Sequence, residues 1–168
     1  MASLRTATAD GDDLAARTRL LEASYLAGVA MNNAGLGAVH AISHAIGGRY
    51  DLPHGHTNAL LLPAVVRRNG ERSPRARERY ASLVESTAPA HEVLADRLRR
   101  LRIDVGLDDC PPGTPDDWAW ESVAASAVAN VNVETNPVEY AESDVVDLCR
   151  RSPFGNESPR PLGSETTK

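Results

Sequence analysis

Apolar residues recur at helical spacing along this chain. From Asp12 onward, Leu14, Leu21, Tyr25 and Val29 follow one another at intervals of seven, four and four residues, which places them on one face of a helix. The later apolar segments read as helices as well, and none shows the sustained alternation that is typical of a half-buried strand. The spacing therefore predicts an all-α fold.

The composition limits how such helices can pack. Apolar residues make up 42% of the 168 residues, but the chain has only one Phe and two Trp. The core must therefore be built from Ala, Leu, Val and Ile, and small aliphatic side chains at this density favour closely packed helices. The length suits one domain with room for a tail.

Glycine and proline divide the chain into predicted helices. We expect helices over 12–34, 37–48, 54–70, 73–87, 88–107, 118–133 and 143–152, with Gly47-Gly48 closing the second and Asn69-Gly70 closing the third. Gly28, inside the first helix, is expected to permit a close helix crossing. The helical domain is assigned to residues 12–151, after a flexible N-terminus at 1–11 and before a disordered tail at 152–168 rich in Pro, Ser and Gly.

The overall charge and the cysteines exclude several function classes. A net charge of -5 gives no electrostatic reason to expect nucleic acid as a partner. No apolar run approaches the length that crosses a membrane, and the N-terminus lacks the apolar region of a signal peptide. Cys110 and Cys149 lie far apart and outside any metal-binding spacing, as expected of free thiols in a reducing compartment. We therefore expect a cytoplasmic protein that acts without a membrane.

Histidines cluster in one short stretch. The chain holds five, and four of them are His40, His44, His54 and His56. Imidazole is the commonest neutral metal ligand, so such a cluster is typical of a metal or proton-transfer site.

The spacing within the cluster supports that interpretation. His40 and His44 are four residues apart and share one face of a helix. His54 follows two glycines and a turn-forming Asp-Leu-Pro, which folds the next helix back toward the same face. The alternative is that two histidines four apart are ordinary helix residues, and that His56 is a polar residue in the first turn of its helix rather than a ligand.

The stretch from residue 35 to residue 69, GLGAVHAISHAIGGRYDLPHGHTNALLLPAVVRRN, resembles the signature of the iron-containing (group III) alcohol dehydrogenases. That signature has a Gly-rich helix with two histidines four apart, then Pro-His-Gly and an Asn-Ala-Leu-Leu-Pro run. The matching residues are Gly35, His40, His44, Gly47, Pro53, His54, Gly55, Asn58, Ala59 and Pro63. The resemblance covers most of residues 14–150. It implies the helical, dehydroquinate synthase-like C-terminal domain of that family.

The resemblance also implies roles for three histidines. His40 and His54 match the metal ligands of the signature, while Gly55 and Asn58 match positions that we interpret as structural. His44 matches the catalytic histidine that the family places beside the metal as a polar or proton-handling group. In that family a divalent metal acts as a Lewis acid on the alcohol or carbonyl oxygen, and NAD or NADP exchanges the hydride. A nitrogen- and oxygen-rich ligand set suits Fe(2+) and Zn(2+) about equally.

The sequence departs from the family pattern in two respects. The family adds an Asp and a His, four residues apart, from a preceding helix, but here no histidine precedes His40. A Gly-rich phosphate-binding turn of a nucleotide-binding domain is also missing. We therefore expect an alcohol dehydrogenase part that is incomplete as a single chain, with its other half on a separate chain or with a homo-oligomer as its working form.

Other functions remain open at this stage. The segment GGRYDLPH at residues 47–54 also resembles maleylacetate reductases, although Gly55-His56 stands where those enzymes carry Ala-Glu. The chain could instead be a non-catalytic helical remnant, or a stand-alone metal-binding domain that uses His40, His44, His54 and His56.

Overall fold

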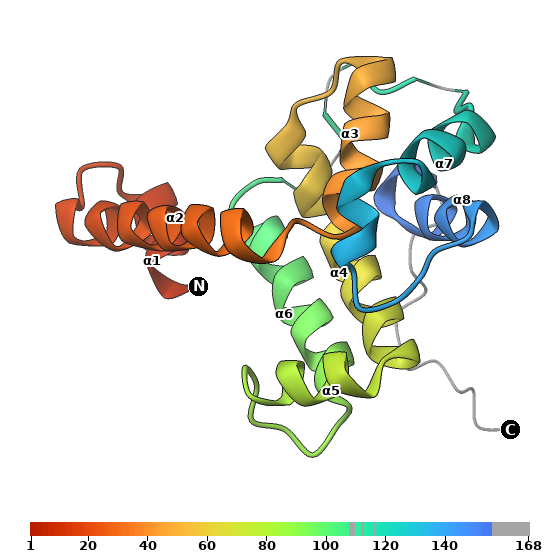
Figure 1. Ribbon diagram of the computed structural model, residues 1–168. Coiled ribbons are helices and arrows are strands. Elements are labelled where there is room, and N and C mark those ends of the chain that lie inside the picture. The colour runs from red at the N-terminus through yellow and green to blue at the C-terminus, as the bar shows by residue number, and fades with distance from the viewer. Residues whose placement is uncertain (108–109, 112, 116, 156–168) are drawn as a thin grey trace, which may run out of the picture.

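Helices make up the regular structure of the protein, which confirms the all-α prediction. The computed structural model describes residues 1–107, 110–111, 113–115 and 117–155, and no strand occurs among them. The α-helices are α1 (Ala2–Ala9), α2 (Leu14–Ala34), α3 (Ala38–Tyr50), α4 (His54–Arg72), α5 (Pro74–Ala81), α6 (Ala90–Asp104), α7 (Trp120–Val128) and α8 (Glu142–Arg151), with 3-10 helices η1 (Val131–Thr135) and η2 (Pro153–Gly155). In Figure 1, α1 and α2 project from a body formed by α3–α8.

The main core lies where α3 packs against α4 and α7, and where α7 packs against α8. Its fully buried members are mostly aliphatic, as the composition predicted: they include Ile42, Ile46, Leu60, Leu61, Val65, Val123, Ala124, Ala127, Val145 and Leu148. Both tryptophans, Tyr50 and Phe154 gather at one end, where the Trp118 and Trp120 rings stack 4.3 Å apart. This core fixes the helices that carry the histidines.

A second, smaller core joins α4 to α6. Its buried members are Val66, Val84, Leu94 and Ala95. Gly70 lies at the crossing, where a Cβ atom would overlap the His91 side chain. Asn69-Gly70 was expected to end the helix, but α4 continues to Arg72 because Asn69 and Gly70 are both buried in contacts with other segments.

The end of α3 also differs from the prediction. Gly47 and Gly48 lie inside the helix, which continues to Tyr50 and ends at Asp51 in the left-handed region, at φ 53°. The Tyr50 hydroxyl accepts a hydrogen bond of 2.8 Å from the Ala119 amide, and its ring meets Trp118 edge-on at 4.8 Å. These contacts hold the last turn in helical form and override the glycines.

Regular elements occur at both ends of the described ranges, within the segments that the sequence assigned to a flexible N-terminus and a tail. Residues 2–9 form α1, and Arg5 pairs with Asp104 of α6 at 2.6 Å. At the other end, residues 153–155 form η2, and Phe154 is buried against Trp118 at a ring distance of 5.1 Å. Burial of that single Phe extends the ordered unit past residue 152, and residues 156–168 lie outside the described part.

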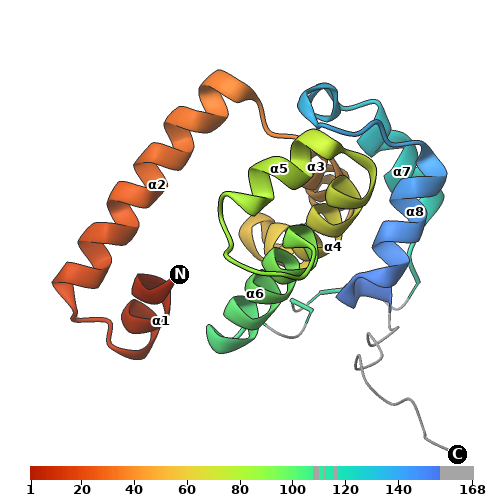
Figure 2. The same cartoon turned by 90° about the horizontal axis from the view of Figure 1, so that it is seen from below.

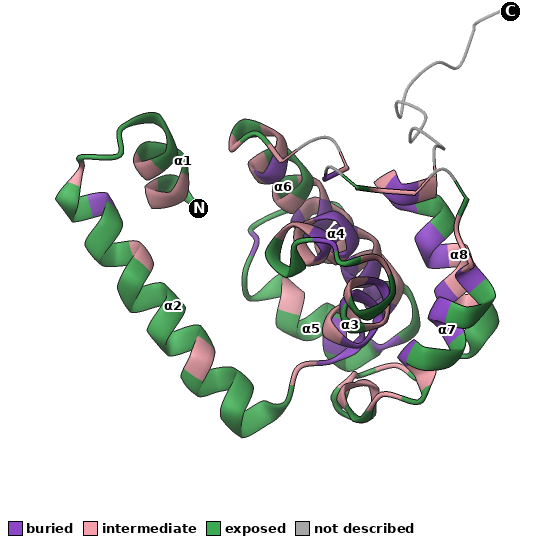
Figure 3. Ribbon diagram, turned by 90° about the horizontal axis from the view of Figure 1, so that it is seen from above, coloured by how far each residue is buried: buried purple, intermediate pink, exposed green. Residues whose placement is uncertain are grey.

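The helix α2 begins at Leu14, two residues later than expected. Its N-cap is Asp13, whose side chain accepts a 2.8 Å hydrogen bond from the Ala16 amide. It stands apart from the body in Figure 2 and is exposed along almost its whole length in Figure 3. The expected close crossing at Gly28 is absent: among the described residues, no atom outside the helix lies within 4 Å of a Cβ atom built there. Within the described ranges, no helix has the length and apolar character to span a bilayer.

Candidate metal and catalytic site

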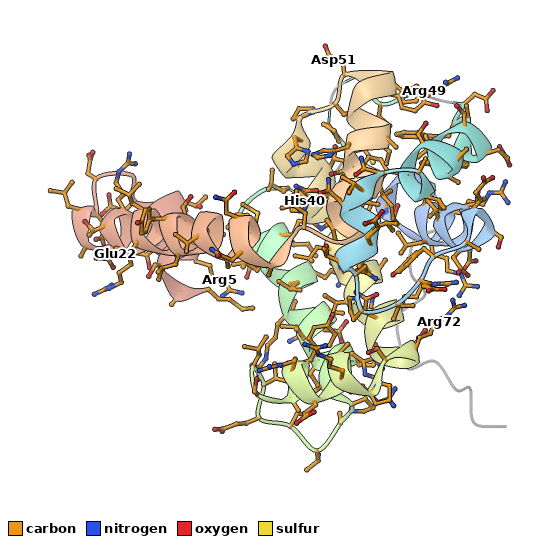
Figure 4. The ribbon with its side chains drawn as sticks, in the orientation of Figure 1. Arg5, Glu22, His40, Arg49, Asp51 and Arg72 are labelled. Carbon is orange, nitrogen blue, oxygen red and sulfur yellow. The ribbon has the colours of Figure 1, made fainter. Side chains whose placement is uncertain are left out.

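Three of the four clustered histidines meet where α3 faces the start of α4. The ring centroids of His40 and His44 are 6.1 Å apart, those of His40 and His54 are 5.4 Å apart, and those of His44 and His54 are 5.0 Å apart. The structure therefore brings together the three residues that the sequence singled out. Figure 4 labels His40 in the first turns of α3, near the junction with α2.

Two tight connections produce this arrangement. Ahead of α3, Gly35 and Gly37 adopt φ values of 78° and 84°, and the Ala38 amide donates to Asn136 Oδ1 at 3.2 Å. After α3, only residues 51–53 separate Tyr50 from the first residue of α4, so His54 returns to the face that carries His44. The local turns thus determine which side of α3 the next helix meets.

Hydrogen bonds favour one tautomer of His54. The buried Ser43 hydroxyl lies 3.2 Å from the His40 carbonyl oxygen, to which it donates, and 3.4 Å from His54 Nδ1. With its proton given to His40, the Ser43 oxygen can accept from a protonated Nδ1. His54 Nε2 then keeps a lone pair, which accepts from the Asn58 side-chain amide at 3.0 Å. This is the nitrogen that could bind a metal, which would take the place of the Asn58 amide at that lone pair.

His44 faces a different neighbour. Its Nδ1 lies 3.4 Å from the Asn132 amide nitrogen of η1. It also borders a cleft of about 560 Å³ between α3 and α7, which Arg49 and Asn130 line as well. Of the three clustered histidines, only His44 lines this cleft.

His40 is the most constrained of the three. Burial lowers its pKa below the ordinary value of 6.5, and the nearby His54 and His44 lower it further. Its Nδ1 atom is buried without a hydrogen-bond partner. A neutral imidazole with an unused nitrogen suits a metal ligand, because a ligand must offer a free lone pair.

The cluster fits a metal only in part. Imidazoles suit Fe(2+) or Zn(2+), and His40 and His54 each offer one suitable nitrogen. In the portion of the chain that the structure describes, however, no three His, Cys, Asp or Glu side chains are arranged to hold a metal ion. His56 lies in the first turn of α4, and its Nε2 is buried without a hydrogen-bond partner. The described chain thus offers a partial site.

Sequence reasoning missed the residues that orient the imidazoles. Ser43 and Asn132 carried no recognisable signal, because a serine inside a helix and an asparagine 88 positions from His44 acquire meaning only through the fold. Asn58 was interpreted as structural, whereas its amide contacts His54 directly. The one sequence feature that singles out Ser43 is its position on α3 between His40 and His44.

Comparisons with known proteins agree with the geometry. Residues 1–152 match the model of the Fe-containing alcohol dehydrogenase family, C-terminal. The chain is 37% identical to the 1,3-propanediol dehydrogenase of Citrobacter freundii over 163 residues, covering 89% of this chain and 41% of that protein. It is 38% identical to alcohol dehydrogenase 4 of Saccharomyces cerevisiae, over 89% of this chain and 40% of that protein.

Solved structures give the same result. An alcohol dehydrogenase from Oenococcus oeni superposes with a TM-score of 0.74 at 35% identity, covering 88% of this chain and 40% of the other. A 1,3-propanediol oxidoreductase superposes with a TM-score of 0.75 at 34% identity, covering 87% and 40%. The chain therefore spans about 40% of the length of the relatives it matches.

Proposed function

Because the chain belongs to the Fe-containing alcohol dehydrogenase family, we propose that it forms the metal-binding C-terminal part of an NAD- or NADP-linked oxidoreductase of small alcohols or carbonyls. The observation that carries the proposal is the cluster of three imidazoles, with ring centroids 5.0–6.1 Å apart, inside the matched region. The named activities of the relatives, on 1,3-propanediol and on alcohols, support a small-molecule alcohol as the substrate.

In this proposal His40 and His54 hold a divalent metal, Fe(2+) or Zn(2+). When bound, the metal would supply Lewis acidity toward the alcohol or carbonyl oxygen. With Ser43 accepting from a protonated Nδ1, Nε2 of His54 would exchange its hydrogen bond from Asn58 for the metal. The buried and unpartnered Nδ1 of His40 is the second available donor.

His44 is the proposed proton-handling residue. Its ring is 5.0 Å from that of His54, close enough for both to face one small substrate. If the Asn132 amide donates to Nδ1, the proton of the neutral ring is left on Nε2. From there His44 could exchange a proton with a substrate hydroxyl, as a general acid or base.

The remaining components come from outside the described residues in this proposal. A hydride must pass to a nicotinamide held in contact with the substrate carbon, and a misplacement of about 1 Å can cost on the order of a hundredfold in rate. We infer that a polypeptide like the part of the relatives that this chain does not match supplies the nucleotide-binding domain and further metal ligands.

The test is reconstitution. The chain is assayed with Fe(2+) or Zn(2+), NAD or NADP, and 1,3-propanediol or 1-propanol, first alone and then with the separately expressed N-terminal part of the Citrobacter freundii enzyme. We expect no turnover alone, and turnover with the added part that disappears in His54→Ala and falls at least about a hundredfold in His44→Ala. His56→Ala is the matched control and should stay near the parent rate. A reconstituted complex that binds metal and nicotinamide but does not turn over either alcohol would contradict the proposal, as would activity that survives His54→Ala.

A further inference from the structure

The cleft between α3 and α7 carries one positive charge and several neutral polar groups. It measures about 560 Å³ and is bordered by Arg49 of α3, by Ser122 and Ser126 of α7, and by Asn130 just beyond that helix. Figure 4 labels Arg49 at the end of α3. Among the described residues, no acidic side chain lines the cleft, although the chain has a net charge of -5. The cleft therefore presents hydrogen-bond donors that suit an anion.

Helix geometry explains why these groups share one cleft. Ser122 and Ser126 are four residues apart and lie on one side of α7, and Asn130 follows at the same interval. On α3, Gly48 lines the cleft beside Arg49. A Cβ atom built at Gly48 meets no atom within 4 Å, so this part of the wall is open. The absence of a side chain there leaves room for a ligand.

The guanidinium of Arg49 is oriented but not neutralised. Its Nη1 donates to the Ser122 hydroxyl oxygen at 3.2 Å, and its central carbon lies 5.7 Å from the centre of the Tyr50 ring. Glu121, the acid next to Ser122 in sequence, pairs with Arg150 at 3.5 Å instead. In the described ranges, no carboxylate pairs with Arg49, and no further hydrogen bond engages its Nε and Nη2. Those two nitrogens form the fork that binds a carboxylate through two parallel hydrogen bonds.

We propose that this cleft is a carboxylate-binding subsite, in which Arg49 and Ser122 hold a small organic anion. Because the Ser122 oxygen accepts from Arg49, its own proton is free to donate to the ligand. Ser122 also lies in the first turn of α7, where the helix dipole favours a negative charge. The subsite goes beyond the proposed function, since it predicts binding of an anion by this chain alone.

The place of His44 names the class of ligand more closely. His44 lines the same cleft and precedes Arg49 by five residues, or about 7.5 Å along the helix axis. A short hydroxy acid can therefore place its carboxylate at Arg49 and extend its hydroxyl toward His44. This step rests on the proposed function, in which His44 exchanges a proton with the substrate hydroxyl. It points to small alcohols that carry a carboxylate at the far end.

The first test measures binding by NMR in the full chain alone, without metal or nicotinamide. Three probes are titrated: 5-hydroxypentanoate, its neutral counterpart 1,5-pentanediol, and inorganic phosphate. The backbone amides of Gly48, Ser122 and Ser126 report binding. Arg49→Gln removes the charge, and Arg49→Lys keeps the charge but removes the fork. Arg75→Gln is the matched control, because Arg75 is also exposed but lies on α5.

We expect 5-hydroxypentanoate to bind with a Kd on the order of 1 mM, since an ion pair at an exposed site contributes little. Its affinity should fall at least about tenfold in Arg49→Gln, fall by a smaller factor in Arg49→Lys, and match the parent in Arg75→Gln. Inorganic phosphate should bind more weakly than the acid, and 1,5-pentanediol should not shift the three amides. Circular dichroism should show the same helix content in all three variants, because both arginines are exposed.

Other results would overturn the proposal. Equal binding of the acid and the diol, unchanged affinity in Arg49→Gln, or an equal loss in Arg75→Gln would exclude the subsite. Tighter binding of inorganic phosphate than of the acid would exclude a carboxylate as its ligand.

The second test uses the reconstituted enzyme. There the ratio of kcat/KM for 5-hydroxypentanoate to that for 1,5-pentanediol should fall at least about tenfold in Arg49→Gln and stay constant in Arg75→Gln. Failure of the subsite and failure of the proposed function are separable. Binding of the acid by the chain without turnover of either alcohol would refute only the function. Turnover with the same ratio in Arg49→Gln and the parent would refute only the role of the subsite.

Discussion

The side-chain amides of Asn69 and Asn136 exchange two hydrogen bonds, of 3.1 and 3.0 Å, across 67 positions of sequence. Asn69 belongs to α4 and Asn136 follows η1. Asn136 also accepts from the Ala38 amide at the start of α3, and Asn69 accepts from the Tyr140 hydroxyl at 3.1 Å. This pair therefore joins the two helices that carry the histidine cluster to the segment leading into α8.

Replacing Asn136 by Ala should destabilise the protein by about 2–4 kcal/mol, because the buried Asn69 amide loses both of its hydrogen bonds to Asn136, the Ala38 amide loses its acceptor, and each unsatisfied group costs about 1–3 kcal/mol. Urea unfolding measures the loss. Asn33→Ala, on the exposed surface of α2, is the matched control and should change the free energy of unfolding by less than about 0.5 kcal/mol. Equal effects of the two substitutions would contradict a structural role for the pair.

Two glycine-to-alanine substitutions should act in opposite directions. Gly70→Ala forces a methyl group into the His91 side chain at the α4–α6 crossing and should cost about 1–3 kcal/mol. Gly48→Ala places its methyl group in open space inside α3 and should stabilise by about 0.5–1 kcal/mol. Thermal unfolding of both variants checks the pair. A stabilised Gly70→Ala would mean that the helices do not cross so closely.

Ser43→Ala should weaken metal binding without unfolding the site. The substitution removes the hydroxyl oxygen that keeps the His54 proton on Nδ1. Loss of such a partner typically lowers metal affinity by roughly 10- to 100-fold. Zn(2+) competition against a coloured chelator measures the change in the chain alone. Ser24→Ala on the exposed surface of α2 serves as the control, and identical affinities in the two variants would exclude the tautomer argument.

The metal-free chain should lose stability as the pH falls below 6.5. Because burial and the neighbouring His54 and His44 lower the pKa of His40, the unfolded state binds more protons than the folded state between that lowered value and 6.5. The free energy of unfolding is therefore highest above 6.5 and declines as the pH falls through this interval. Urea titrations of chelator-treated protein should show a shallower decline in His40→Gln than in the parent or in His56→Gln.

Cys149 should not react with a thiol reagent while the protein is folded. It is completely buried, and burial raises the pKa of its thiol to about 12, so the reactive thiolate is scarce at neutral pH. In a Cys110→Ala variant, where Cys149 is the remaining thiol, we expect no colour with a disulfide reagent until urea is added. Reaction at the same rate with and without urea would contradict burial in the main core.

Much of the fold could be predicted from local signals. Helical spacing and the lack of large aromatic residues indicated closely packed helices, and Pro53, Pro74 and Pro89 lie at or next to helix starts, as their sequence positions suggested. The errors fall where distant contacts override local preference. Gly47 and Asn69-Gly70 remain helical because Tyr50 and Asn69 bind remote segments, and Phe154 orders a stretch whose composition alone predicts a tail.

The histidine cluster was predictable for a different reason. His40 and His44 share a face through helix geometry, and the short turn after Tyr50 limits where His54 can lie. The partners of these imidazoles were not predictable in the same way. Asn132 approaches His44 only because η1 packs against α3. Ser43 reaches His54 only because α4 is rotated so that its first residue faces α3.

The turn at Asp51 sets the number of residues between the two helices that carry the histidines. Asp51 is the one non-glycine residue with positive φ in the described ranges, and three residues carry the chain from α3 to α4. Each residue added or removed at a helix start would rotate the following side chains by about 100°. A single-codon insertion or deletion between Tyr50 and His54 would therefore swing the His54 imidazole away from its neighbours while leaving every helix intact. Substitutions at residues 51–53 can alter the chemistry of this turn. A change in the number of residues between α3 and α4, however, would separate the three histidines.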